Sequence, residues 1–352
     1  MKRKVRVAQY GLGAIGKISA RFCLAKGAEL VAAFARSSEQ VGTDAGEILG
    51  IGPIGTPVSH SDRLEEVLIR TRSDIVVFST KSHLADIREA ALICLRNKVN
   101  VLDIGENAFW PWTEEPDIAA ELDAAAKEYG VTISASGCPD VCWGTLITTF
   151  AASCNKLTKI RCDSFLNLES YNADYMFEYH GVGLTLAEFE EKFGSAVITE
   201  TDGRLPCLPG DQNAWLCSKL GLTVTSQTMQ YIPIVRETDF NSKSFGRVIK
   251  AGELEGLGQL CRTETAEGVV IELMMGGKTD VTGVDEHTVW TLEGEPTSTL
   301  VWDNPDTYGL TCANAVNRIP QVINAAPGYQ TTDRFPDSRY LVKPMNEYVN
   351  GE

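Results

Sequence analysis

The chain of 352 residues carries 47 acidic against 32 basic side chains, which gives a formal net charge of −15 at pH 7. Its composition, 43% hydrophobic and 22% charged, is that of a globular protein long enough for two domains. The acidic balance argues against a nucleic-acid or anionic-membrane partner, because nothing offsets repulsion from phosphate groups.

The N-terminal segment and the cysteines predict a cytoplasmic protein. The apolar run after Lys4 breaks at Gln9 and Gly11, unlike a signal peptide, and no apolar stretch reaches membrane-spanning length. Without a secretory context, we expect the ten scattered cysteines to be buried free thiols. Cys138 and Cys142 have the spacing of metal ligands, but no second pair or nearby His completes a set, so we expect no metal.

The first half of the chain alternates strand and helix patterns. Buried strands are predicted at 5–11, 29–35, 74–80, 99–105 and 131–137. Helical spacing of apolar residues is found between them, at 14–26, 61–71, 83–98 and 114–130. Strands that alternate with amphipathic helices imply right-handed βαβ units and a parallel sheet. We therefore predict an α/β fold that begins with a doubly wound Rossmann domain over residues 1–140.

The pattern changes after about residue 155. Alternating or β-branched segments predict a large mixed sheet with antiparallel pairs, from residues 157–170, 222–238, 268–279 and 286–302. Shorter helices are predicted at 184–194 and 210–221. A long helix at 306–325 should pack back on the first domain, and the polar segment from Tyr329 should form a surface arm. The predicted divisions are the Rossmann domain 1–140, an α+β substrate domain 141–307, and the helix with its arm 308–352.

A glycine motif lies between the first strand and the first helix. Gly11 permits a tight turn, Gly13 lets the backbone approach a pyrophosphate, and Gly16 allows the helix to pack closely on the strand. Ala14 and Ile15 begin the helix, whose N-terminus supplies hydrogen-bond donors and partial positive charge to phosphates. The alternative is an ordinary tight turn, but the strand–turn–helix context favours a dinucleotide site.

The end of the second strand distinguishes between cofactors. No acid ends this strand, where NAD-binding proteins usually carry one for the ribose hydroxyls. Arg36 stands there with Ser37 and Ser38, and an Arg can stack on adenine and pair with a 2′-phosphate. We therefore predict NADP(H). NAD(H) stays possible because Glu39 lies nearby and Arg36 can instead be a solvent-facing loop residue.

Later strand ends should meet the first at one edge, because the carboxyl ends of parallel strands point the same way. Candidates to line the ribose, the pyrophosphate and the reaction centre there are Ser79, Thr80, Glu106, Cys138, Asp140 and Trp143.

Glu106 is the candidate proton-transfer group. A partly buried carboxylate has a raised pKa and can move protons or hold a cationic intermediate near neutral pH. The alternatives are that it caps the next segment or pairs with an Arg. Lys81 and His180 are rival acid/base candidates. Aromatic side chains expected to surround the Glu106 carboxyl are Phe109, Trp110, Trp112 and Trp143.

Five segments carry a family resemblance: VAQYGLGAIG (7–16), VLDIGENAFWPW (101–112), SGCPDVCWG (136–144), ESYNADYMFEYHGVG (169–183) and ANAVNRIPQVINAAPG (313–328). Together they resemble the native amine dehydrogenases and 2,4-diaminopentanoate dehydrogenases, relatives of dihydrodipicolinate reductase. The resemblance implies NAD(P)H-dependent, reversible reductive amination of a small ketone or aldehyde with ammonia. It also implies a homodimer built through the sheet of the second domain, with Glu106 as the catalytic carboxylate.

The resemblance further suggests roles for residues around the substrate. Those that would shape the pocket or reach the nicotinamide are Cys138, Trp143, Tyr171, His180, Asn314 and Asn317. The chain lacks the His-His-x-x-Lys signature of the reductases and the Glu-Lys-Pro segment of related sugar dehydrogenases. No second acidic set is placed to bind the distal groups of 2,4-diaminopentanoate, which favours a simpler amine. The alternatives are a 2,4-diaminopentanoate dehydrogenase, a carbonyl or hydroxyl oxidoreductase, and a non-catalytic NADP(H)-binding sensor.

Overall fold

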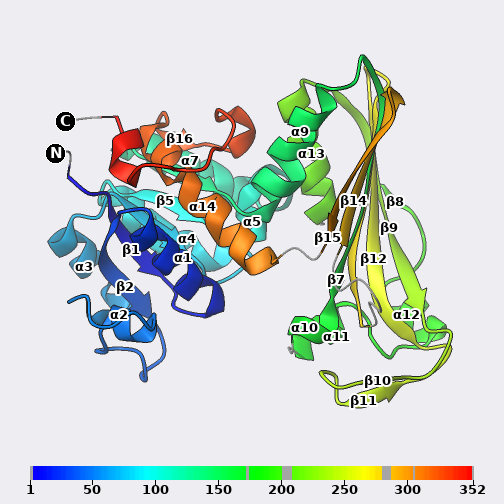
Figure 1. Ribbon diagram of the computed structural model, residues 1–352, viewed down its shortest axis with the longest axis horizontal. Coiled ribbons are helices and arrows are strands. Elements are labelled where there is room, and N and C mark those ends of the chain that lie inside the picture. The colour runs from blue at the N-terminus through cyan, green and yellow to red at the C-terminus, as the bar shows by residue number, and fades with distance from the viewer. Residues whose placement is uncertain (1–2, 172–173, 200–207, 280–286, 304–305, 351–352) are drawn as a thin grey trace. The chain divides into compact units, whose positions relative to one another are not determined.

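The computed structural model describes residues 3–171, 174–199, 208–279, 287–303 and 306–350 (Figure 1). The chain forms two compact units, Met1–Leu146 with Asp306–Glu352, and Ile147–Pro305. The first unit has a parallel sheet and the second a mixed sheet, which confirms the predicted fold class. Among the helices described, none is long and apolar enough to cross a membrane.

Seven parallel strands form the sheet of the first unit. In sheet order they are β16 (Gly328–Tyr329), β6 (Thr132–Ala135), β5 (Asn100–Asp103), β4 (Ile75–Phe78), β1 (Arg6–Tyr10), β2 (Glu29–Ala35) and β3 (Val58–His60). All four residues of β4 are buried, as expected for a strand with helices on both faces. The chain leaves β1 toward β2 on one side and returns to β4 on the other, and ligands of such sheets bind at this reversal. The five predicted strands are present; β3 and β16 are too short to leave a pattern.

Helices cover this sheet. They are α1 (Ala14–Ala25), α2 (Ala45–Ile48), α3 (Leu64–Thr71), α4 (Leu84–Arg96), α5 (Glu106–Phe109), α6 (Pro111–Glu114), α7 (Pro116–Tyr129), α8 (Cys138–Asp140) and α14 (Thr307–Asn324). A π-helical turn follows α8 at Val141–Thr145, and 3-10 turns occur at Ser61–Arg63, Thr332–Arg334 and Met345–Tyr348. The long α7 begins with Pro116 and ends at Gly130, whose φ of +73° stops the helix in the left-handed region.

The last helix completes the core of the first unit. Although the second unit, Ile147–Pro305, comes before α14 in the sequence, the helix lies against α1 and β5 of the first unit (Figure 1). Val316 and Ile319 of α14 join Val7 of β1 and Val77 of β4 in one buried apolar cluster. The two ends of the chain therefore build a single core.

The second unit contains a seven-stranded mixed sheet. Its order is β15 (Ser298–Asp303), β14 (His287–Glu295), β7 (Lys156–Asn167), β13 (Val270–Lys278), β12 (Leu254–Thr265), β9 (Val224–Val235) and β8 (Ile198–Thr199). Only β7 and β13 pair in parallel among the described strands of this sheet. The segment predicted at 157–170 leaves the sheet after Asn167, and the one at 286–302 is the hairpin of β14 and β15.

Short elements accompany this sheet. They are the hairpin β10 (Phe240–Ser242) and β11 (Arg247–Ile249), with α9 (Leu146–Ala151), α10 (Leu168–Tyr171), α11 (Asp174–Tyr179), α12 (Leu186–Lys192) and α13 (Leu208–Leu220). α13 packs on β12 and β13, where Trp215 and Leu216 are fully buried. This packing gives the sheet one apolar face covered by a helix.

Candidate active site

The glycine motif closes a tight turn from β1 into α1. Gly11 has a φ of +98°, and a Cβ there would lie 2.7 Å from the carbonyl oxygen of Ser79. A Cβ on Gly16 would lie 2.1 Å from the carbonyl oxygen of Gly11. Gly13 instead faces open space, directly before Ala14 begins the helix. Gly11 and Gly16 are therefore required by the turn itself, whereas Gly13 leaves the backbone open to a ligand at the helix N-terminus.

Ser79 and Thr80 lie beside this turn, at the end of β4. The Ser79 hydroxyl accepts a hydrogen bond from Nε2 of the buried Gln9 at 2.9 Å and donates to the carbonyl oxygen of Gly11 at 3.2 Å. Cγ2 of Thr80 would be 2.8 Å from a Cβ on Gly11. Both residues are at the predicted edge, but the Ser79 hydroxyl is engaged in holding the glycine turn.

Exposed side chains follow β2. Arg36, Ser37 and Ser38 all reach solvent, and Arg36 makes no hydrogen bond or salt bridge with any residue that the structure describes. Burial raises the pKa of Tyr10 at the end of β1, and the positive charge of Arg36 opposes that rise. The guanidinium is thus near the ends of both strands and available to a phosphate group.

Glu106 is the first residue of α5, directly beyond β5. Its side chain reaches solvent, yet surrounding protein atoms remove enough water from the carboxyl to raise its pKa. The charge of His83 opposes this rise. No hydrogen bond or salt bridge to a described residue occupies the carboxyl, so the structure provides no arginine partner of the kind considered above. A carboxyl that is free and has a raised pKa is suited to proton transfer.

The aromatic residues after Glu106 have different environments. Phe109 is buried, and Trp110 is half-buried. Trp112 packs against the core and meets Tyr329 edge-on, with ring centroids 5.5 Å apart. Trp112 therefore helps to anchor the segment after α5 to the sheet.

Sequence reasoning gave no role to His83, the residue that precedes α4. Its Nδ1 lies 3.4 Å from Nδ2 of Asn107, and the same Asn107 amide donates to the carboxylate of Glu114. Because Nδ2 of Asn107 is a donor, Nδ1 of a neutral His83 is the acceptor in this contact. A polar network of His83, Asn107 and Glu114 thus begins one residue after Glu106. The only feature of the sequence that pointed to His83 was its position past the end of a strand.

A buried ion pair lies behind the strand ends. Both side chains of Arg318 and Asp140 are 0% exposed, with Nε and Nη2 of Arg318 each 2.7 Å from a carboxylate oxygen. Ser136 donates to the same carboxylate at 2.7 Å, and Nη1 of Arg318 donates to Gln321 and to the carbonyl oxygen of Pro336. Asp140 is therefore a structural partner that joins α8 to α14.

Asn314 of α14 lies against the segment that follows β6. Its Nδ2 donates to the carbonyl oxygen of Gly137 at 3.1 Å and to Sγ of Cys142 at 3.4 Å. Hydrogen bonds from the Cys138 thiol and from Asn314 lower the pKa of Cys142. Cys138 is buried and Trp143 half-buried on this segment. The structure thus brings Asn314 and Cys138 together. None of the nine described cysteines is in a disulfide.

The remaining predicted pocket residues belong to the second unit. His180 is 5% exposed, and its Nδ1 lies 2.8 Å from the carbonyl oxygen of Met176. Burial lowers the pKa of His180, which keeps the ring neutral at physiological pH. Tyr171 ends α10, and its side chain lies outside the described part of the chain.

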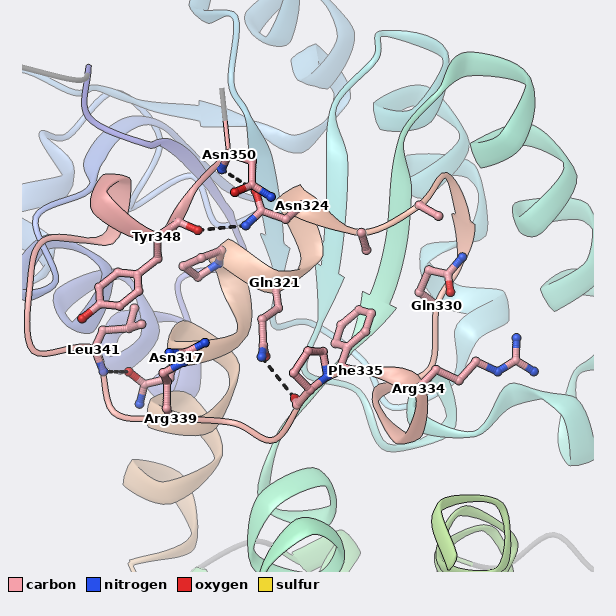
Figure 2. A pocket seen from close by; sticks show the side chains of 14 residues that line it. Asn317, Gln321, Asn324, Gln330, Arg334, Phe335, Arg339, Leu341, Tyr348 and Asn350 are labelled. Atoms are coloured by element: carbon pink, nitrogen blue, oxygen red, sulfur yellow. Dashed lines mark hydrogen bonds between the residues drawn. The ribbon is translucent and has the colours of Figure 1, made fainter. Parts of the chain in front are cut away.

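A cavity of about 480 Å³ lies between the C-terminal half of α14 and the segment after β16 (Figure 2). Asn317 is on its wall, and its Oδ1 accepts the backbone N–H of Leu341 at 3.2 Å. Gln321 and Asn324 likewise bond to the C-terminal arm. Asn317 therefore fixes the arm rather than sharing the hydrogen-bond partners of Asn314.

Comparisons with known proteins agree with this geometry. The family model of the 2,4-diaminopentanoate dehydrogenase C-terminal domain matches residues 141–351, and that of the dihydrodipicolinate reductase N-terminus matches residues 5–136. The 2,4-diaminopentanoate dehydrogenase of Acetoanaerobium sticklandii is 28% identical over 371 residues, which cover 99% of this chain and 98% of that protein.

Solved structures extend the comparison. An amine dehydrogenase from Mycobacterium smegmatis is 35% identical, with a TM-score of 0.82, over 96% of this chain and 98% of that chain. Myo-inositol 2-dehydrogenase from Lactobacillus plantarum shares the fold at 14% identity, with a TM-score of 0.57 over 98% and 95% of the two chains. Since one family model spans more than half of the sequence and a 35% identical relative spans nearly all of it, the chain belongs to the amine dehydrogenase and 2,4-diaminopentanoate dehydrogenase family.

Proposed function

We propose that this protein is an NAD(P)H-dependent amine dehydrogenase, which interconverts a small ketone or aldehyde plus ammonia with a primary amine. The observation that carries the proposal is Glu106, a carboxyl with a raised pKa and no described partner, at the ligand-binding edge of a parallel sheet. The relatives named as an amine dehydrogenase and as a 2,4-diaminopentanoate dehydrogenase support the same chemistry.

The first unit fits a dinucleotide cofactor. The open space at Gly13 and the N-terminus of α1 suit a pyrophosphate, because a Cβ is absent where the phosphates would approach. Arg36, with Ser37 and Ser38, would hold a 2′-phosphate, and Asn314 would support the nicotinamide end. When bound, the nicotinamide supplies or accepts the hydride.

Glu106 would move the accompanying protons. In the aminating direction ammonia adds to the carbonyl carbon, and the Glu106 carboxylate accepts a proton from the new nitrogen. The alkoxide oxygen left by the addition takes a proton from solvent and becomes a hydroxyl. The protonated carboxyl then gives its own proton to that hydroxyl, which leaves as water while the C=N bond forms. The ionised carboxylate that results stabilises the iminium cation by its negative charge. Partial desolvation of the carboxyl strengthens this interaction.

The experiment is NADPH oxidation with a small ketone or aldehyde, with and without concentrated ammonium. We expect turnover that requires ammonium and falls at least about 100-fold in Glu106→Gln, with the NADPH affinity unchanged. Equal rates without ammonium would identify a carbonyl reductase. Full activity of Glu106→Gln would move the acid/base role to Lys81 or His180, and NADPH binding without any turnover would indicate a sensor.

NADP(H) is proposed as the preferred cofactor, because Arg36 stands where an NAD-binding protein usually has an acid. Arg36→Gln should weaken NADPH binding about 10-fold or more and leave NADH binding nearly unchanged. Equal losses for the two cofactors would contradict a contact with the 2′-phosphate.

2,4-Diaminopentanoate is the second candidate substrate, supported by the name of the relative from Acetoanaerobium sticklandii and by the matching C-terminal family model. Oxidation of this diamino acid in preference to simple primary amines would favour 2,4-diaminopentanoate as the substrate.

We further propose a cytoplasmic homodimer that pairs through the sheet of the second unit. The absence of disulfides among the nine described cysteines supports a reducing compartment, and sedimentation would test the dimer.

A further inference from the structure

Asp103, the last residue of β5, is a buried carboxyl outside the chemistry described so far. It is 0% exposed, three residues before Glu106. Its Oδ1 accepts the backbone N–H groups of Ile104 at 2.8 Å and of Gly105 at 3.1 Å. Its Oδ2 is buried and has no hydrogen-bond partner among the described residues.

Burial of this carboxyl is costly. Loss of water raises the pKa of Asp103 to about 7, while the two backbone N–H groups lower it. A buried carboxyl with one oxygen unpaired costs free energy of folding. Both hydrogen bonds of Oδ1 go to the turn that leads into α5.

The turn before Glu106 is confined from two sides. Gly105 is the residue that precedes α5, and a Cβ there would lie 2.7 Å from the carbonyl oxygen of Lys81 and 2.9 Å from Oδ2 of Asp103. In the same loop as Lys81, the carbonyl oxygen of Ser82 accepts the N–H of Asn107 at 3.2 Å. The first turn of α5 is therefore held between Asp103 and the loop after β4.

We propose that Asp103 is a positioning residue, which fixes the Glu106 carboxyl for proton transfer by holding the N–H groups of Ile104 and Gly105. The N–H of Ile104 also donates to the carbonyl oxygen of Phe78 at 3.1 Å. Among the described residues, by contrast, the N–H of Gly105 donates only to Oδ1 of Asp103. Loss of Oδ1 therefore frees the residue directly before Glu106. The inference relies on the proposed function only for the chemistry that Glu106 performs.

Asp103→Ala removes the acceptor, and Asp103→Asn keeps an oxygen at the Oδ1 position. We expect kcat to fall about 100-fold in Asp103→Ala, as for a misplacement of a catalytic group by about 1 Å, with the NADPH affinity unchanged. Asp103→Asn should restore kcat to within about 10-fold of the unmodified protein, because the acceptor is kept. Ser134→Ala on the adjacent strand β6 is the control, since it also removes a buried polar atom without a described partner.

A double-mutant cycle decides whether Asp103 acts through Glu106. In a Glu106→Gln background, Asp103→Ala should cause no further loss of kcat. An equal loss in both backgrounds, or an NADPH affinity that falls together with kcat, would overturn the proposal in favour of a general role in folding.

Hydrogen exchange gives a readout independent of turnover. Exchange at residues 104–107 should accelerate in Asp103→Ala and stay slow in Asp103→Asn and Ser134→Ala. Unchanged exchange in Asp103→Ala would overturn the inference even in an active enzyme. Conversely, faster exchange in a protein without ammonium-dependent turnover would support the positioning role and refute the proposed function alone.

Discussion

At the scale of single residues, two opposing effects set the pKa of Glu106. Desolvation raises the pKa of its carboxyl, and His83 lowers it. His83 is exposed and contacts Asn107, the neighbour of Glu106 on α5. An exposed imidazole can therefore adjust the pH at which Glu106 becomes ionised.

His83→Gln should raise the pKa of Glu106 further, because it removes the only neighbouring charge found to oppose desolvation. If ionised Glu106 accepts the first proton, the acidic limb of the pH–rate profile will move to higher pH. Arg96→Gln, at the far end of the same helix α4, removes a charge of similar kind and should leave the profile in place. A shift to lower pH in His83→Gln would contradict this electrostatic role.

Asp103 should make stability depend on pH. Its pKa in the folded chain is about 7, against 3.8 for the ordinary side chain, so between these values the folded chain keeps a proton that the unfolded chain has released. The contribution of Asp103 to stability therefore falls as pH rises through this range and becomes constant above about 7.

Urea unfolding at about pH 5 and about pH 8 would measure this contribution. Relative to Asp103→Asn, the unmodified protein should lose unfolding free energy at the higher pH, on the order of a few kcal/mol. An identical difference between the two proteins at both pH values would show that Asp103 does not titrate in this range.

At the scale of elements, the ion pair between Asp140 and Arg318 joins α8 to α14 across 178 residues of sequence. Two hydrogen bonds from Arg318 and one from Ser136, all of 2.7 Å, satisfy the carboxylate. Nη1 of Arg318 also donates to the carbonyl oxygen of Pro336 in the C-terminal arm. Asn314, on the same helix, contacts the segment after β6. The position of this segment therefore depends on α14.

Arg318→Met should destabilise the first unit by about 3–5 kcal/mol, because it leaves the buried Asp140 carboxylate without its partner. Asp140→Asn combined with Arg318→Met should recover part of that loss, since the unpaired charge is then gone. Denaturant unfolding measures both, with Arg21→Met on the exposed side of α1 as the control. Additive losses in the double variant would contradict a paired role.

At the scale of the whole molecule, the first unit is built from both ends of the chain. Buried residues of α14 and of the C-terminal arm, Val322 and Phe335 among them, share one apolar cluster with β1 and β4. Loss of this apolar contact removes much of the hydrophobic free energy that stabilises the folded unit.

A chain that ends at Asp303 should therefore lose NADPH binding and the cooperative unfolding of its first unit. Near-ultraviolet circular dichroism and limited proteolysis would show the loss, and a chain that ends at Asn350 serves as the control. Retained NADPH binding in the shorter chain would show that residues 1–146 fold without α14.

The glycine turn, the strand–helix alternation and the location of Glu106 beyond a strand end were predictable, because each depends on local patterns of a few neighbouring residues. The role of Ser79 was not, since its hydroxyl is directed to Gly11, 68 residues away in sequence. The Asp140–Arg318 pair and the contact of His83 with Asn107 were also missed, because the partners come from different elements.

The sequence by itself determined the fold class, the glycine turn and the location of Glu106 beyond a strand end. These features follow from backbone sterics at glycine, from hydrophobic periodicity and from the common direction of parallel strands. Only the tertiary structure decided which polar groups are buried and paired: Asp103 inside the turn, Asp140 with Arg318, and Asn314 apart from Asn317. Burial and hydrogen-bond geometry set the pKa and orientation of such groups, and both depend on contacts between segments that are distant in sequence.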